Sequence, residues 1–362
     1  VSFQNSVDLA VSQMNANLTA AGSNIQFAVV HSDDGGTGAG ALSSLQSEFQ
    51  SAGVQVVIGP LTSGEVLATV QYATQKHIVV LPGAATATAL IGVSPYVFRP
   101  GQPGDQLEGT SIAKSIIQTG QKNAVFLYRD DPSEAGTYNI SSKILLAAGF
   151  GVQGIALPPL QADYAAQVQA ANTAVGQYLS SGGTTSNTAV AILDGGTEAQ
   201  NVFQHAATSS NLGTVRWYGI ESLAGHTLLA SAAGPFMAQV NLTISAPQNL
   251  NSPHFTYFNT TYTAKFGGPP EPYSGYFYDN AWIAMLSTLA AGSYSGDKII
   301  AVLPTVADHF FGASSTSIWL VNHDQSIGFY DILKCAASGG ASSFIKIGTY
   351  NGQTGDLILT GK

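Results

Sequence analysis

The sequence predicts an α/β protein of two Rossmann-like lobes, each with a parallel sheet covered by helices. Apolar runs of strand length alternate with amphipathic segments of helix length along most of the chain. Loops of Gly, Ala, Ser and Thr follow several of these apolar runs. The chain has 362 residues, which is long for one core and favours two domains.

Lobe one is predicted to begin with a helix, because apolar residues recur every three or four positions. These residues are Phe3, Val7, Val11, Met14 and Leu18. Strands are then expected at 25–31, 54–58, 78–82 and 96–99, and helices at about 40–52, 63–76 and 104–119. A strand normally opens a βαβ series, so the first strand of this lobe is absent from the sequence. Either the sequence is trimmed at its start or another segment fills that place.

Lobe two is predicted from a second βαβ series. Strands are expected at 124–128, 151–157, 190–193, 215–218 and 239–245, and helices at 134–148, 163–179 and near 197–210. The chain is expected to cross between lobes at 120–122 and at 247–253, and helices at 252–266 and 273–291 then return to lobe one. We therefore expect lobe one to comprise 1–119 and 247–325, and lobe two 120–246 and 326–362.

The composition excludes several classes of function. Charged residues make up 9% of the chain, against about 25% in ordinary soluble proteins. A net charge of −9 with 12 Lys and Arg provides no basic stripe for nucleic acid. No apolar run reaches the roughly 18 residues of a membrane span and no signal sequence opens the chain, so a soluble chain is expected.

Motifs of catalysis are also missing, so we expect neither an enzyme nor a cofactor nor a metal site. The seven His residues are scattered, and neither H-E-x-x-H, C-x-x-C nor G-x-S-x-G occurs. Residues 36–41 match the dinucleotide pattern G-x-G-x-x-A. However, Asp33 and Asp34 directly before it would repel a pyrophosphate, so a turn into a helix is the preferred interpretation.

Two small-residue loops are the best candidates for a ligand site. One contains Thr62 and Ser63, and the other contains Ala84, Ala85 and Thr86. Each follows a predicted buried strand of a parallel sheet, where ligands of open α/β sheets bind. The hydroxyls of Ser63 and Thr86, with free backbone N–H groups of helix starts, could hold a carboxylate. The alternative is simple N-capping.

Five segments of the chain are informative in their order and spacing: VVIGPLTSG at 56–64, PGAATATAL at 82–90, VFRPGQPGDQLEG at 97–109, AVFLYRDDPSEAG at 124–136 and WYGIESLAG at 217–225. At these five places the chain resembles the type I periplasmic binding proteins, in the branch that binds leucine, isoleucine and valine for ABC transporters. The resemblance spans nearly the whole chain. It implies two lobes joined by three crossovers, with a ligand cleft between them that closes like a hinged trap.

The resemblance also implies roles for individual residues. Ser63 and Thr86 match hydroxyl residues that grip the carboxylate and ammonium of an amino acid, and Ala84 matches a residue whose carbonyl faces the ammonium. Glu221 matches the acid that pairs with the ammonium. The alternative for Glu221 is an acid at a helix start that faces water.

The sequence departs from the family at several site positions. Ser133 and Thr197 stand near positions where the family has tyrosines, which leaves side-chain specificity open. Asp194 either faces the cleft, where it favours a polar or cationic ligand group, or caps the next helix. Tyr276 and Tyr278 either line the entrance or belong to the core.

These observations predict an extracytoplasmic solute-binding protein that captures a small zwitterion, an amino acid of the branched-chain kind, and delivers it to an ABC permease. A monomer is expected from the resemblance. Two alternatives stay open: an extracellular sensor domain of a receptor with the same fold, and an α/β enzyme that uses the loop at Gly36 for a nucleotide.

Overall fold

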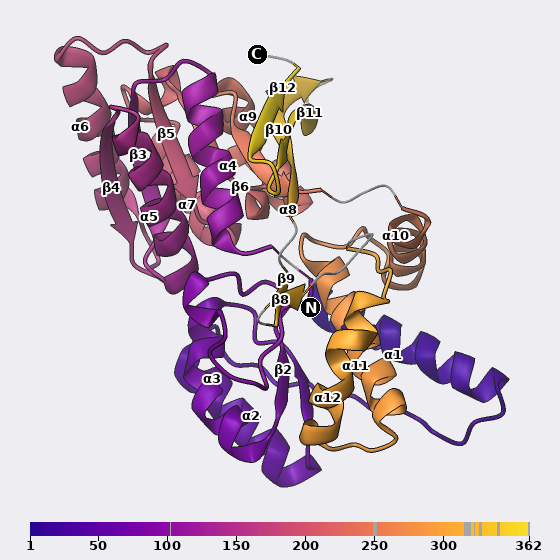
Figure 1. Cartoon of the computed structure of the whole chain (residues 1–362). Coiled ribbons are helices and arrows are strands. Elements are labelled where there is room, and N and C mark those ends of the chain that lie inside the picture. Colours follow the sequence, from indigo (N-terminus) through magenta and orange to yellow (C-terminus); the bar gives the residue numbers. More distant parts are fainter. Residues whose placement is uncertain are drawn as a thin grey trace. The chain divides into compact units, whose positions relative to one another are not determined.

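The computed structural model describes residues 1–101, 103–248, 252–314, 320–321, 323–325, 328–338 and 341–360. The chain divides into two compact units (Figure 1). Unit 1 comprises Val1–Gly104 and Asn249–Ile327, and unit 2 comprises Asp105–Gln248 and Gly328–Lys362. Among the described helices, none is both long enough and apolar enough to cross a membrane.

Unit 1 contains a small parallel sheet surrounded by helices. Strands β1 and β2 pair in register from Val56 with Val79 to Ile58 with Leu81. Helices α1 and α11 pack against each other, and so do α2 and α3. The elements of unit 1 are α1 Ser2–Ala20, α2 Gly38–Ala52, β1 Val56–Ile58, α3 Ser63–Lys76, β2 Val79–Leu81, the 3₁₀ turn η1 Thr88–Leu90, α10 Pro253–Phe266, α11 Ser274–Ala291, α12 Gly296–Asp308, β8 Leu320–Val321 and β9 Asp324–Gln325.

The predicted strand at 25–31 is wrong, because this segment forms no strand among the described residues. Its Phe27 backbone instead bonds to a side chain: Phe27 N donates to Asn15 Oδ1 at 2.8 Å, and Asn15 Nδ2 donates to Phe27 O at 2.9 Å. A cavity of about 830 Å³ lies beside the segment, lined by apolar residues of α1, β1 and α11 that include Val7, Ile58 and Met285. The predicted strand at 96–99 is reduced to single bridges, Val80 with Val97 and Arg99 with Asp324.

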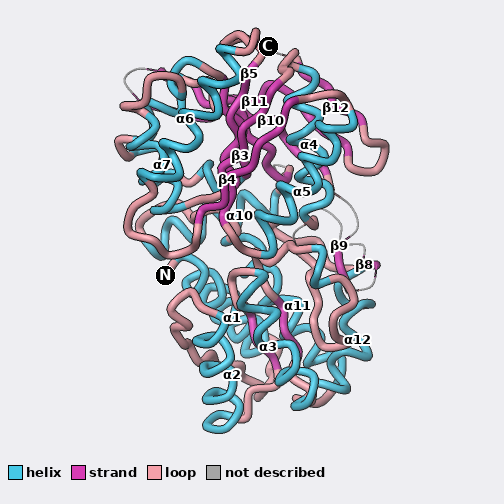
Figure 2. Tube along the Cα trace, turned by 90° about the vertical axis from the view of Figure 1, so that its left-hand side faces the viewer, coloured by secondary structure: helices cyan, strands magenta, loops and turns pink. Residues whose placement is uncertain are grey.

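Unit 2 contains one large mixed sheet (Figure 2). The strand order is β12-β11-β10-β7-β6-β5-β3-β4, parallel from β4 to β7 and antiparallel from β7 to β12. The elements of unit 2 are α4 Asp105–Gln118, β3 Asn123–Arg129, α5 Pro132–Ala147, β4 Gly151–Leu157, α6 Ala165–Ser180, β5 Thr188–Leu193, α7 Gly196–Ala206, η2 Leu212–Thr214, β6 Arg216–Ile220, η3 Glu221–Ala224, α8 His226–Ala230, α9 Ala233–Gln239, β7 Thr243–Pro247, β10 Phe329–Ser338, β11 Ala341–Asn351 and β12 Asp356–Leu359.

Alternating residues of β3 belong to two different hydrophobic cores, one on each face of this sheet. Val125 and Leu127 pack with residues of α6, α7 and α9 on one face. Ala124 and Phe126 pack with residues of α4 and α5 on the other. Burying such apolar faces gives about 25 cal/mol per Å² of apolar surface, so both faces stabilise the sheet. The loops after the neighbouring strands β3 and β5 therefore lead to helices on opposite faces.

The described structure differs from the predicted lobes in three respects. Helix α4 was expected in lobe one, but it packs against α5 and contacts β6 and β7, so it belongs to unit 2. Gln239 was expected to open a strand, but it ends helix α9. The antiparallel strands β10 to β12 were not predicted. Residues 249–251 of the predicted crossing at 247–253 lie outside the described residues.

Candidate functional site

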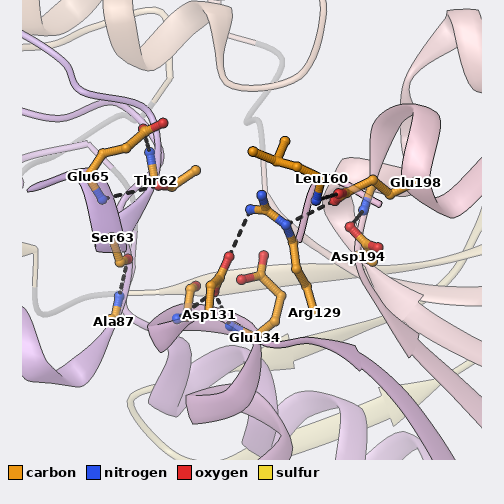
Figure 3. A network of polar contacts seen from close by, with 12 residues as sticks. Thr62, Ser63, Glu65, Ala87, Arg129, Asp131, Glu134, Leu160, Asp194 and Glu198 are labelled. Atoms are coloured by element: carbon orange, nitrogen blue, oxygen red, sulfur yellow. Dashed lines mark hydrogen bonds and ion pairs between the residues drawn. The ribbon is translucent and has the colours of Figure 1, made fainter. Parts of the chain in front are cut away.

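The first loop of unit 1 forms a complete helix cap. Thr62, not Ser63, is the N-cap of α3: its hydroxyl accepts from Glu65 N at 3.3 Å, and Glu65 Oε2 accepts from Thr62 N at 2.7 Å (Figure 3). Ser63 is 1% exposed and lies inside the first turn, where its Oγ accepts from Ala87 N at 3.0 Å. This bond joins the two predicted loops at the carboxyl ends of β1 and β2. The Ser63 hydroxyl proton is still available for a ligand.

The second loop is held by a buried arginine that the sequence analysis did not single out. Arg99 is 4% exposed, and its Nη1 donates to the carbonyls of Ala85 at 3.2 Å and Ala87 at 2.9 Å. Its Nε pairs with Asp324. Thr86 is buried, but no α-helix begins there, because only the three-residue turn η1 follows. The expected helix start at Thr86 is therefore wrong. Ala84 is half-buried in the same loop.

In unit 2, polar residues gather where β3, β5 and β6 end. These strands are parallel neighbours, so their carboxyl ends lie at one edge of the sheet. The chain order reverses between β3 and β5, and their helices α5 and α7 cover opposite faces. Such a switch point is where doubly wound sheets bind ligands. We call seven acids at this edge, together with Arg129, the acidic cluster: Asp105, Glu108, Asp131, Glu134, Asp194, Glu198 and Glu221.

Arg129 forms ion pairs with two members of the acidic cluster. Its Nη1 lies 2.9 Å from Asp131 Oδ2, and its Nε lies 2.9 Å from Glu198 Oε2 (Figure 3). Asp131 is also the N-cap of α5, accepting from the backbone N–H groups of Ser133 and Glu134. Asp131 and Glu198 are half-buried, and each is paired with Arg129, which offsets the loss of hydration.

One carboxyl oxygen of Asp194 has no hydrogen-bond partner among the described residues. It is 2% exposed, and Oδ1 accepts from Gly195 N at 2.7 Å. Oδ2 is buried and accepts no hydrogen bond from the described residues. Burial and the charge of Glu198 raise the pKa of Asp194 to about 8. Helix α7 has Gly195 as its N-cap and no side-chain cap, so the capping alternative for Asp194 is wrong.

Glu221 and Glu108 form a second group of interacting side chains in the acidic cluster, in addition to Arg129 with Asp131 and Glu198. Both are 7% exposed, so the alternative of a Glu221 side chain facing water is wrong. Their carboxyl groups hydrogen-bond to each other, which requires one of the two to carry a proton. Burial and the neighbouring Glu221 raise the pKa of Glu108 well above its ordinary value. Glu108 Oε1 accepts no hydrogen bond from the described residues.

Asp105 and Glu134 connect the carboxyls around Arg129 with the pair of Glu108 and Glu221. The pKa of Glu134 is raised well above its ordinary value by burial, by a hydrogen bond with Asp131 and by the charges of Asp131, Asp105 and Asp194. Asp105 in turn faces Glu108. The hydroxyl of Ser133 donates to Asp105 Oδ1 at 3.0 Å, so this predicted site residue belongs to the same cluster.

The remaining predicted site residues lie elsewhere. Thr197 is exposed in the first turn of α7. Tyr276 is 6% exposed, and its ring packs over Gly101, where a Cβ would lie 2.8 Å from Cδ1. Tyr278 is a core residue between α11 and α1, and its hydroxyl donates to Gln13.

Most of the acidic cluster was not identified as a site from the sequence. Only Asp194 and Glu221 were predicted as site residues, whereas Asp105, Glu108, Asp131, Glu134, Glu198 and Arg129 were not. A signal was present: Arg129, Asp131 and Glu134 directly follow a predicted strand, and acids are scarce in this chain. No group of three or more His, Cys, Asp and Glu in the described part of the chain could hold a metal ion.

Comparisons with known proteins identify relatives along most of the chain. The model of a family described as periplasmic binding protein matches residues 1–324. An uncharacterized protein of Methanocaldococcus jannaschii is 23% identical over 324 residues, which cover 84% of this chain and 75% of that protein.

Several solved structures are similar to this one. A solute-binding protein of an ABC transporter from Rhodopseudomonas palustris, in complex with 3,4-dihydroxybenzoic acid, has a TM-score of 0.80 at 18% identity and covers 97% of this chain and 92% of that one. The leucine-binding protein LivK from Thermotoga maritima has a TM-score of 0.77 at 17% identity, covering 95% and 92%. LivJ from Streptococcus pneumoniae, in complex with isoleucine, has a TM-score of 0.72 at 19% identity, covering 95% and 94%. These similarities confirm the predicted α/β fold of two lobes.

Proposed function

The chain belongs to the periplasmic binding protein family, and from this premise we propose that it is an extracytoplasmic solute-binding protein of an ABC transporter. Its proposed solute is a small zwitterion, an amino acid, which it delivers to a permease without catalysing a reaction. We propose a monomer as the working form. The members of this fold differ in ligand, so the site residues have to support the choice of solute.

The buried carboxyl of Glu221 is the observation that carries this proposal. It follows β6 directly, at the carboxyl edge of a parallel sheet, and it is 7% exposed. A carboxylate in such a place needs a cation or a hydrogen-bonded partner, and Glu221 hydrogen-bonds with the carboxyl of Glu108, whose pKa is raised well above its ordinary value by burial and by Glu221. The ammonium group of an amino acid would replace the proton of this hydrogen bond and form charge-assisted hydrogen bonds.

Unit 1, considered by itself, contains groups suited to a carboxylate. The Ser63 hydroxyl, the loop from Ala84 to Thr86 and Thr62 lie at the carboxyl ends of β1 and β2. Arg99 holds this loop in place by donating to its carbonyls, and Asp324 balances the charge of Arg99. We propose that Ser63 and Thr86 bind the carboxylate and that the Ala84 carbonyl accepts from the ammonium.

Aromatic acids are the second candidate, because a similar structure holds 3,4-dihydroxybenzoic acid and another holds benzoate. Such a ligand has an anionic group but no ammonium. It would leave Glu221 and Asp194 without a counter-charge, so the acidic cluster favours the amino acid.

A thermal-shift screen tests the proposal. The protein is stripped of bound solute by partial unfolding and refolding, then mixed with each of the twenty amino acids, benzoate and 3,4-dihydroxybenzoate. A ligand at a thousand times its Kd adds about 4 kcal/mol, which is several degrees in melting temperature. A shift with one or more amino acids supports the proposal. A shift with an aromatic acid alone would replace the amino acid as solute.

A further inference from the structure

The acidic cluster contains more negative groups than the ammonium of one ordinary amino acid can balance. Arg129 pairs with Asp131 and Glu198, and one ammonium would serve Glu221. Asp194, Glu108 and Glu134 then still have no Lys or Arg within ion-pair distance among the described residues. Burying ionised carboxyls without a positively charged partner is strongly unfavourable. The acidic cluster therefore favours the binding of further positive charge.

Each of these three side chains has one buried oxygen without a hydrogen bond. Asp194 Oδ2, Glu108 Oε1 and Glu134 Oε2 accept no hydrogen bond from the described residues. The charged groups that influence the pKa of Asp194 include Glu198, Arg129 and Asp131, and those that influence the pKa of Glu108 include Glu221, Asp105 and Glu134. A buried acceptor without a donor costs about 1 to 3 kcal/mol, more when charged, and a bound donor removes that cost.

Asp194 and Glu221 lie at the ends of two neighbouring strands. Asp194 directly follows β5 and Glu221 directly follows β6, and these two strands pair in parallel. No metal-binding group occurs among the described residues. Carboxyls at two strand ends fit an organic cation with donors at both of its ends.

We propose that the acidic cluster binds two cationic groups of one ligand, so that the solute is a basic amino acid with its α-ammonium at Glu221 and Glu108 and its side-chain cation at Asp194. This inference rests on the proposed function, because it takes the solute to be an amino acid. The raised pKa values of Glu108, Glu134 and Asp194 accord with it, since a cation that binds there displaces protons.

Titration calorimetry on the ligand-free protein at pH 7.5 separates the possibilities. L-lysine is compared with L-norleucine, which lacks the side-chain ammonium, and with 1,5-diaminopentane, which lacks the carboxylate. We expect L-lysine, L-ornithine or L-arginine to bind at least about 100-fold more tightly than L-norleucine, as removal of a buried charge pair predicts. We also expect binding to release protons, seen as a heat that depends on the ionisation enthalpy of the buffer.

Two variants and one control assign the second cation to its residue. Asp194→Asn should weaken the basic amino acid about 100-fold and change L-norleucine binding by less than about threefold. Glu108→Gln should weaken both. The matched control is Asp130→Asn, because Asp130 is exposed and lies in the same loop as Asp131. Circular dichroism shows that each variant is folded.

The outcomes distinguish this inference from the proposed function. If L-leucine or L-norleucine binds as tightly as every basic amino acid, the proposed binding of a second cationic group at Asp194 is wrong. The proposal that the solute is an amino acid then still holds. If 1,5-diaminopentane binds and no amino acid does, the proposed sites for two cationic groups hold. The proposal that the solute is an amino acid is then wrong. If none of these amines binds, or if Asp194→Asn leaves the preference unchanged, the inference is overturned.

Discussion

Replacing Asp194 by Asn should remove much of the pH dependence of stability in the ligand-free protein. The pKa of this carboxyl is about 8 in the folded state, first because of burial and second because of Glu198. Its ordinary value is 3.8, and the unfolded chain should be close to that. The folded state therefore binds the proton more tightly than the unfolded state. Stability from this group is fully present below about pH 4 and is lost as the pH rises to about 8.

The size of this loss follows from the pKa difference. About four pKa units at about 1.4 kcal/mol per unit set an upper bound of about 6 kcal/mol. Entry of water and relaxation of the loop reduce such values, so we expect about 2 to 4 kcal/mol. Arg129 opposes the loss by stabilising the carboxylate, whereas Asp131, Glu198 and Glu134 increase it.

Urea unfolding at pH 4.5, 6, 7 and 8 measures this effect. Wild type and Asp194→Asn should diverge as the pH rises, with the variant becoming the more stable of the two. The exposed Asp130→Asn serves as the control, and its free energy of unfolding should run parallel to that of wild type. If the curves of wild type and Asp194→Asn are parallel from pH 4.5 to 8, Asp194 does not titrate in this range and the reasoning fails.

Three further substitutions test the site. Glu221→Gln should weaken amino-acid binding by about 2 to 5 kcal/mol without unfolding the protein, because the ammonium loses its anionic partner. Titration calorimetry measures this change, and an unchanged affinity would remove Glu221 from the site. Ser63→Ala should cost about 1 to 3 kcal/mol of unfolding free energy, because Ala87 N loses its acceptor, whereas exposed Ser51→Ala should cost less than about 0.5 kcal/mol in the same urea titration. Thr62→Ala should cost about 1 kcal/mol, since it removes the cap of α3, and a melting temperature equal to that of wild type would contradict that role.

The sequence predicted the α/β fold and its family, because apolar strands, helices and small-residue loops repeat in a regular order. It failed at 25–31, where an apolar run of strand composition has no backbone partner among the described residues and bonds to the Asn15 side chain. Composition sets the propensity of a strand, but pairing decides whether it forms. The hairpin of β10 and β11 was missed because its pairing partner on the other side, β7, lies far away in the sequence.

The candidate site was predicted only in part. Ser63 was predicted from its small-residue loop after an apolar strand, and Glu221 from the resemblance of residues 217–225 to the family. Glu108 was not, because it lies on α4, one turn inside a helix, and nothing local shows that its carboxyl meets Glu221. Contacts between elements distant in sequence are set by the sheet order, and a single sequence does not display that order.

Arg129 and the seven acids of the acidic cluster carry a formal charge of −6, two thirds of the net −9 of the whole chain. The rest of the molecule carries a formal charge of −3, so the acidic cluster is the largest single source of negative potential when its carboxyls are ionised. A cation diffusing nearby is drawn toward that source, so its association rate should fall as ionic strength rises. Because several of the carboxyls lose their protons only at raised pH, the same attraction should strengthen in alkaline solution. The cluster would thus govern how fast a solute arrives as well as how tightly it is held.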